Sequence, residues 1–280
     1  MDKVLINVFE DTIQITLLVT LMMIIIDIMN LWTKGKIGSL LRKKGKFRQY
    51  TVSSFIGTIP GCFGGFTNVS LYMHGLISFG ALAGSMIAVS GDEAFVMLAM
   101  FPKTAIILFI VLFFIGIFAG KLVDLLIKRF KISTCEDCEE LVIHNTERNI
   151  KHFIKEHIYV HIIKKHVWKI ALWTFGALLV VNISLKYLNL EQFTTNYPII
   201  FLIVGALIGL IPESGPHLIF VTLFANGLVP FSVLLTSSIV QDGHGMLPLL
   251  SYSLKDSIKI KLFNFVFGLI IGLTLFSLGL

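Results

Sequence analysis

Apolar residues occur in long runs that short polar stretches and Gly/Pro clusters interrupt. A membrane-crossing helix needs about 20 mainly apolar residues, and several runs have that length while others have about half of it. Short broken helices are typical of transporters, where non-helical backbone lines a cavity. The pattern predicts an all-α polytopic membrane protein of about ten transmembrane or re-entrant helices, with candidate segments 11–32, 51–60, 66–74, 75–90, 92–101, 104–128, 167–189, 198–211, 217–226, 228–241, 246–254 and 258–279.

An internal repeat organises these runs. A shift of 152 residues aligns 57–106 with 209–258 without a gap, and 15 of the 50 pairs are identical. The identical pairs include Gly and Pro positions, which biased composition alone would not keep in register. We therefore expect a first transmembrane repeat in 1–128, a hydrophilic loop in 129–166 and a second transmembrane repeat in 167–280.

Charge predicts how the repeats are oriented. The loop 33–48 has seven Lys and Arg and no acid, and 129–166 and 255–261 are also Lys-rich, whereas 190–197 has Glu191 and no base. Basic loops stay in the cytoplasm, which predicts that both termini are external. The two copies then begin on opposite sides of the membrane, as in inverted-topology repeats that meet near the bilayer midplane.

Composition supports a membrane protein. Hydrophobic residues make up 55% of the 280 and charged residues only 14%, whereas soluble domains have about 25% charged residues. The net charge of +6 comes from clusters that set topology, so no nucleic-acid partner is expected. Three cysteines do not form a disulfide framework.

The two repeat cores, 51–101 and 198–254, contain acids and histidines but no Lys or Arg. A carboxylate in hydrocarbon costs several kcal/mol unless something compensates its charge. The acids must be protonated, face water or hold a cation, and a cation is the economical answer. These residues lie in Gly/Pro breaks where unwound carbonyls add ligands. The predicted substrate ligands are Asp92, Glu93, Glu213, His217, Asp242 and His244.

Further candidates lie at the same breaks or in the first helix. Cys62 is a softer ligand, and Asp27 is an intramembrane acid that faces either the same cavity or the cytoplasmic interface. Oxygen and nitrogen ligands together suit Mn, Fe, Co or Zn. We expect the metal as substrate, with no permanently bound cofactor. The predicted hinges are Pro60, Gly91, Pro212 and Gly243.

The loop 129–166 has its own metal-like pattern. Cys135 and Cys138 form a CxxC, and five histidines follow, of which His157 and His161 have helical i, i+4 spacing. CxxC is the spacing of zinc-type sites. A metal-sensing or metal-delivery loop and a plain solvated linker both remain open.

Three motifs carry a family resemblance. The runs GALAGSMIAVSGDEAFVMLAMFP, GLIPESGPHLIFVTLFANG and SSIVQDGHGMLPLL resemble the ten-helix heavy-metal exporters, a family also labelled manganese transporters or arsenic-efflux-like permeases. The resemblance spans nearly the whole chain. It implies a polytopic inner-membrane transporter of a metal-related substrate, with SGDE, PESGPH and QDGHG as its signature motifs.

We therefore expect a non-enzymatic secondary transporter that exports a divalent transition metal by alternating access, with protons as the coupling ion. The alternatives are an oxyanion or small-anion permease and an intramembrane lipid-pyrophosphate phosphatase. Small-xxx-small spacings such as Gly80/Gly84 and Gly116/Gly120 predict close helix packing within the bundle and leave a homodimer open.

Overall fold

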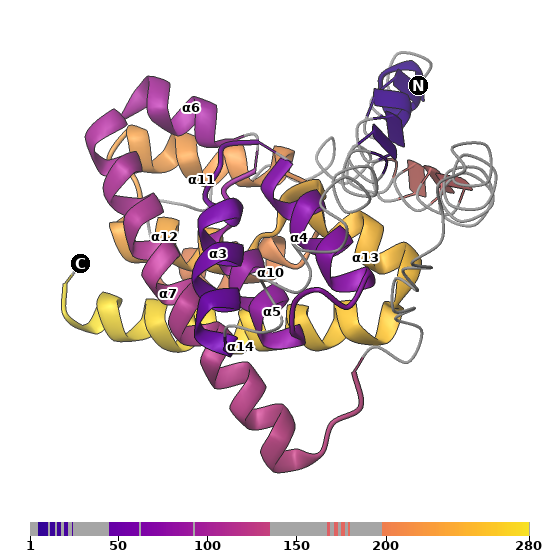
Figure 1. Ribbon diagram of the computed structural model, residues 1–280. Coiled ribbons are helices and arrows are strands. Elements are labelled where there is room, and N and C mark those ends of the chain that lie inside the picture. The colour runs from indigo at the N-terminus through magenta and orange to yellow at the C-terminus, as the bar shows by residue number, and fades with distance from the viewer. Residues whose placement is uncertain are drawn as a thin grey trace, which may run out of the picture.

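The computed structural model describes residues 45–61, 63–91, 93–134 and 198–279, with scattered residues in 5–24 and 167–179. These residues form helices and connecting turns, without a strand among them (Figure 1). The first half contains α3 (Lys46–Gly57), α4 (Phe63–Met73), α5 (Phe79–Ala88), α6 (Glu93–Met100) and α7 (Pro102–Phe130). The second contains α10 (Pro198–Gly209), α11 (Gly215–Ala225), α12 (Phe231–Val240), η3 (Gly243–Met246), α13 (Leu247–Tyr252) and α14 (Leu254–Ser277).

The duplication predicted from the sequence extends to the backbone. Adding 152 to the bounds of α3, α4 and α5 reproduces both ends of α10, α11 and α12, and it maps the first residue of α7 onto that of α14. Even the residues before α5 and α12 match, because Ser78 has φ −74° and ψ 161° and Pro230 has φ −73° and ψ 166°. The two halves therefore repeat the same local structure.

Glycine turns end α4 and α11 in the same way. Gly75 and Gly227 have φ of 63° and 70°, the left-handed region that glycine adopts without a steric penalty. Leu76 N donates to Leu71 O at 2.8 Å, and the equivalent bond in the second half is 2.9 Å, the pattern of a Schellman motif. Because of these turns, α5 and α12 begin four and three residues later than the apolar runs predict.

Small residues bring neighbouring helices into contact, as their spacing predicts. A Cβ added at Gly84 of α5 would collide with Gly116 O of α7, and one added at Gly116 would lie 2.5 Å from Gly84 O. In the second half, a Cβ at Gly268 of α14 would lie 2.7 Å from Val240 Cγ2 of α12. These glycines therefore serve packing within the chain.

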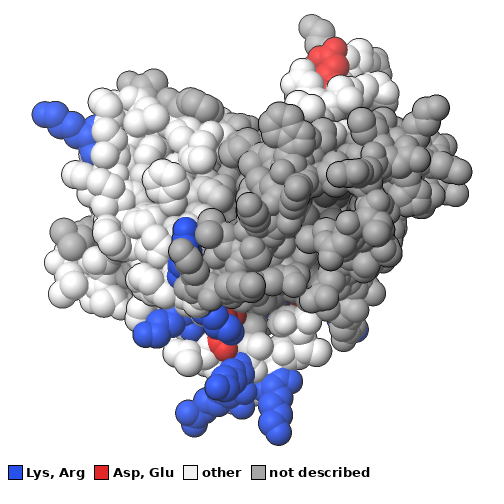
Figure 2. All heavy atoms as spheres, in the orientation of Figure 1, with Lys and Arg blue, Asp and Glu red and all other residues white. Residues whose placement is uncertain are grey.

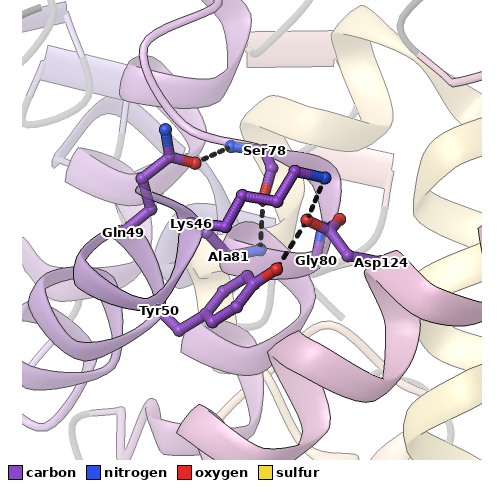
Figure 3. Close-up of polar contacts among 7 residues, drawn as sticks. All are labelled: Lys46, Gln49, Tyr50, Ser78, Gly80, Ala81 and Asp124. Atoms are coloured by element: carbon purple, nitrogen blue, oxygen red, sulfur yellow. Dashed lines mark hydrogen bonds and ion pairs between the residues drawn. The ribbon is translucent and has the colours of Figure 1, made fainter. Parts of the chain in front are cut away.

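Asp124 anchors the first half at the end of this packing (Figure 3). Its Oδ2 accepts from Tyr50 Oη at 2.8 Å and pairs with Lys46 Nζ at 2.9 Å, and its Oδ1 accepts from Gly80 N at 2.8 Å. The last bond satisfies a backbone N–H at the beginning of α5 that has no partner within the helix. Asp124 thus ties α3, α5 and α7 together.

Two of the described helices are long and apolar enough to cross a membrane, α7 with 29 residues and α14 with 24. At 1.5 Å per residue they span about 44 and 36 Å, more than the roughly 30 Å hydrocarbon core. Their outer faces expose large apolar side chains, including Ile110, Phe114, Val266 and Ile270. Lipid chains are the natural contact for such faces.

Candidate functional site

The breaks of the two repeats meet inside the described helices. Gln241, which follows α12, donates from Nε2 to Val89 O at 3.1 Å. These two residues are equivalent under the 152-residue shift, so the bond joins corresponding points of the two halves. Gly61 N donates to Gly91 O at 2.8 Å, which brings the earlier break of the first half to the same place.

Ser214 lies between the two equivalent glycines of these breaks. A Cβ added at Gly91 or at Gly243 would lie 2.9 Å from Ser214 Oγ in either case. Both glycines have positive φ, 59° and 51°, so each break needs glycine for its conformation as well as for its space. The predicted hinge positions Gly91 and Gly243 therefore lie where the halves contact each other.

Glu213 and His244 form a buried pair of ionisable side chains in this region. Glu213 Oε1 lies 2.7 Å from His244 Nε2, and both residues are 8% exposed. The same carboxylate oxygen accepts from Ser214 N at 3.0 Å and Gly215 N at 3.4 Å. As the sequence predicts, α11 begins after Glu213, with Pro216 in its first turn. The partial positive charge of the helix N-terminus stabilises this carboxylate.

Glu93 borders the same region from the first half. It begins α6 and is 1% exposed. A Cβ added at Gly91 would lie 2.5 Å from Glu93 Oε2 as well as 2.9 Å from Ser214 Oγ. Glu93 therefore lies beside Gly91, on the first-half side of the contact between the halves, and the Glu213–His244 pair belongs to the second half.

His217 pairs with a serine of a neighbouring helix rather than with an acid. It is 2% exposed, and its Nδ1 lies 3.0 Å from Ser237 Oγ of α12.

A second pair of glycines also brings the two halves together. A Cβ at Gly65 of α4 would lie 2.8 Å from Gly245 Cα of η3. The residues equivalent to Gly65 and Gly245 in the other half are His217 and Glu93, and their helices α11 and α6 also pack together.

Asp242 has a basic partner that the sequence did not predict. We expected the acids of the cores to lack a basic partner, but Lys261 of α14 forms an ion pair with Asp242 Oδ2. Asn264 Nδ2 also donates to Asp242 Oδ1 at 3.1 Å. The expectation fails because a basic residue outside 198–254 reaches into that core from a neighbouring helix. Lys261 and Asn264 are spaced i, i+3 on an apolar helix, a pattern that could have drawn attention to them.

The remaining predicted positions fall into two groups. Pro60 and Pro212 lie in the breaks, three residues beyond the ends of α3 and α10.

Among the residues that the structure describes, no group of three or more His, Cys, Asp or Glu side chains could hold a metal ion. The positions outside the described residues are Asp27, Cys62, Asp92, Cys135, Cys138, His157 and His161.

The family comparison agrees with the resemblance carried by the three motifs. A family model described as "Putative, 10TM heavy-metal exporter" matches residues 1–187 and 170–279. Neither a curated protein nor a solved structure matches the chain significantly. The two matched segments cover nearly all of the 280 residues. The chain therefore belongs to this family of ten-helix integral membrane proteins, described as heavy-metal exporters.

Proposed function

We propose that the protein is a secondary active transporter that exports a divalent transition-metal cation of the Mn, Fe, Co or Zn class. The observation that carries this proposal is the buried Glu213–His244 pair, 2.7 Å apart, beside the glycines at which the two halves meet. A carboxylate oxygen and an imidazole nitrogen are ligands that such metals share. The metal is the substrate, and no permanently bound cofactor is needed.

The binding site that we propose uses donors from both halves. Glu213 and His244 come from the second half and Glu93 from the first, with His217 in the first turn of α11 after Glu213. Asp92 and Cys62 are the further ligands expected from the sequence. A metal held between the halves would be released when they separate on one side, which is the physical basis of alternating access.

We propose that the two halves form an inverted repeat, an arrangement found in many transporters that work by alternating access. Support comes from Lys259, near the beginning of α14, whose Nζ donates to Ser133 O just beyond the end of α7 at 2.5 Å. The beginning of α14 and the segment that follows the equivalent helix α7 thus lie together. An inverted repeat likewise brings the beginning of one helix to the side of the membrane at which its equivalent ends.

The orientation that we propose has both termini outside and the loops 33–48 and 129–166 in the cytoplasm of a bacterial-type inner membrane. Figure 2 supports it, since most of the visible Lys and Arg side chains gather at the lower end of the molecule, where α7 ends. Lys128 and Arg129 belong to the last turn of α7. Basic residues at one membrane face are typical of the cytoplasmic side.

Protons are the counter-ion that we propose for export. A pH gradient across liposomes would then drive metal flux.

We also propose that the cytoplasmic loop senses or delivers the metal, through Cys135, Cys138, His157 and His161. A protein with both cysteines replaced by serine should then bind less zinc, measured as metal per protein after dialysis.

The central test is metal flux in proteoliposomes. The wild-type protein should move Mn, Fe, Co or Zn, and Glu213→Gln should abolish that flux. Asp256→Asn is the matched control: Asp256 is a buried carboxylate that pairs with Lys259 at 2.9 Å outside the site, so its flux per folded protein should stay near wild type. Equal flux in Glu213→Gln and wild type would refute the proposal.

The alternatives gain no support from Lys261. A phosphatase needs positive charge against its substrate, and the Lys261 ammonium is matched by the Asp242 carboxylate. An anion permease would use half-helix N-termini, and the Glu213 carboxylate at the N-terminus of α11 would repel its substrate. The family description also names export rather than catalysis.

A further inference from the structure

The ammonium group of Lys261 lies among oxygen atoms from three parts of the second half. Besides its ion pair with Asp242, Nζ donates to Gly209 O at 2.8 Å and approaches Val240 O at 3.5 Å. Gly209 is the last residue of α10, and Val240 is the last residue of α12. Carbonyls at helix C-termini have no partner within the helix and carry partial negative charge.

The close approach of α10 to α12 builds this group of oxygens. A Cβ at Gly209 would lie 2.8 Å from Val240 Cβ, so only glycine lets the two helix ends come so near. Asn264 donates a hydrogen bond to Asp242 Oδ1, and the Lys261 ammonium pairs with the other carboxylate oxygen, Oδ2. The Asp242 side chain is fully buried and that of Lys261 is 12% exposed. An ammonium has three donors, and the site offers three oxygens.

The first half shows that the repeat does not need this ion pair. The residues equivalent to Asp242, Lys261 and Asn264 are Ser90, Phe109 and Leu112. The equivalent helices α5 and α7 still pack closely, at Gly84 and Gly116. The charged group is therefore specific to the second half, and packing alone does not account for it.

We infer that Asp242 and the carbonyl oxygens of Gly209 and Val240 form a site for a monovalent cation, in which the ammonium of Lys261 takes the place of a free ion such as NH₄⁺ or K⁺. Backbone carbonyls that replace a hydration shell are how K⁺ is held in channels. Because the cation is covalently attached, the site is always filled in this conformation. Its consequence for coupling rests on the proposed transport function: metal export should need no added Na⁺ or K⁺.

Thermal unfolding of the purified protein in detergent tests the site without any transition metal. Lys261→Ala removes the ammonium and leaves space, whereas Lys261→Met removes the charge and fills the space. Both should unfold at lower temperature than wild type, by about 5–10 °C, because Asp242 loses its partner. Ammonium or potassium chloride should restore Lys261→Ala towards the wild-type value, while choline chloride at the same ionic strength, too large for the site, should not.

Control variants separate binding of a cation at this site from a general effect of salt on stability. Lys261→Met and the wild type should show no difference between ammonium and choline, and Lys261→Arg should stay closer to wild type than either neutral variant. The double variant Asp242→Asn with Lys261→Met should unfold above Lys261→Met alone, because no buried charge is left unpaired. This comparison also applies if Lys261→Ala fails to fold.

A Lys261→Ala protein that ammonium, potassium and choline affect equally would overturn the inference, as would a double variant no more stable than Lys261→Met. Replacing Na⁺ and K⁺ by choline in the flux assay should leave wild-type export unchanged. Because the unfolding measurements need no transition metal, they can succeed or fail independently of the proposed export function.

Discussion

Gly91 and Gly243, which the 152-residue shift makes equivalent, lie against each other where the two halves meet. A Cβ at Gly243 would lie 3.7 Å from Gly91 Cα and 2.9 Å from Ser214 Oγ. Both breaks can approach this closely because neither glycine carries a side chain. The Glu213–His244 pair and Glu93 surround this contact, so the position of the charged groups depends on it.

The first prediction concerns the glycine of the second break. Gly243→Ala should destabilise the protein by more than about 2 kcal/mol and reduce metal flux strongly, because a left-handed alanine costs roughly 1–2 kcal/mol and its methyl group would also press on Ser214. Gly227→Ala is the control, since Gly227 has φ of 70° but nothing within 4 Å of an added Cβ. Thermal unfolding and flux should separate the two variants, and equal losses would contradict the prediction.

The second prediction concerns the Glu213–His244 pair. Glu213→Gln and His244→Gln should each lower metal affinity by about tenfold or more, since even partners outside the ligand shell are worth 10–100-fold. The double variant should lose less than the two single losses combined, because the residues act as one unit. Metal binding by calorimetry on purified protein measures this. Additive losses would mean that the two residues act separately.

The third prediction ranks the stability losses expected when Asp124 or either of its side-chain partners, Tyr50 and Lys46, is replaced (Figure 3). Asp124→Asn should cost about 2–4 kcal/mol, because a buried carboxylate loses its ion pair and charge-assisted hydrogen bonds. Tyr50→Phe should cost about 1–3 kcal/mol. Lys46→Met should cost at most about 1 kcal/mol, because the Lys46 side chain is 66% exposed. Unfolding temperatures should follow this order, and a Lys46→Met protein as unstable as Asp124→Asn would contradict it.

The fourth prediction concerns the helix contact between α5 and α7. Gly84→Ala should destabilise the protein by about 1–3 kcal/mol, because its methyl group would collide with Gly116 O and the helices would have to separate. Gly215→Ala is the matched helical control, where an added Cβ would lie 3.9 Å from Glu213 Cγ. It should be neutral or stabilising by up to about 1 kcal/mol, since alanine favours a helix. Unfolding temperatures of both variants check this.

Local sequence signals predicted much of the fold. The repeat, the positions of the breaks and the beginning of α11 after Glu213 follow from Gly, Pro and apolar periodicity. These features depend on backbone preferences that act within a few residues. The turns after Gly75 and Gly227 put the expected starts of α5 and α12 too early, because their apolar residues resemble the beginning of the next helix. The expected starts of α3 and α14 were five and four residues too late, because their first turns contain polar and charged residues.

The sequence by itself determined the class of protein, its duplicated halves and the set of ionisable residues at the breaks, because each depends on composition or on local conformation. Only the tertiary structure decided which charges compensate each other. Lys261 reaches Asp242, and Lys46 reaches Asp124 over 78 positions, because helices far apart in the chain pack side by side. No local rule predicts such partners, since they depend on the packing of the whole bundle.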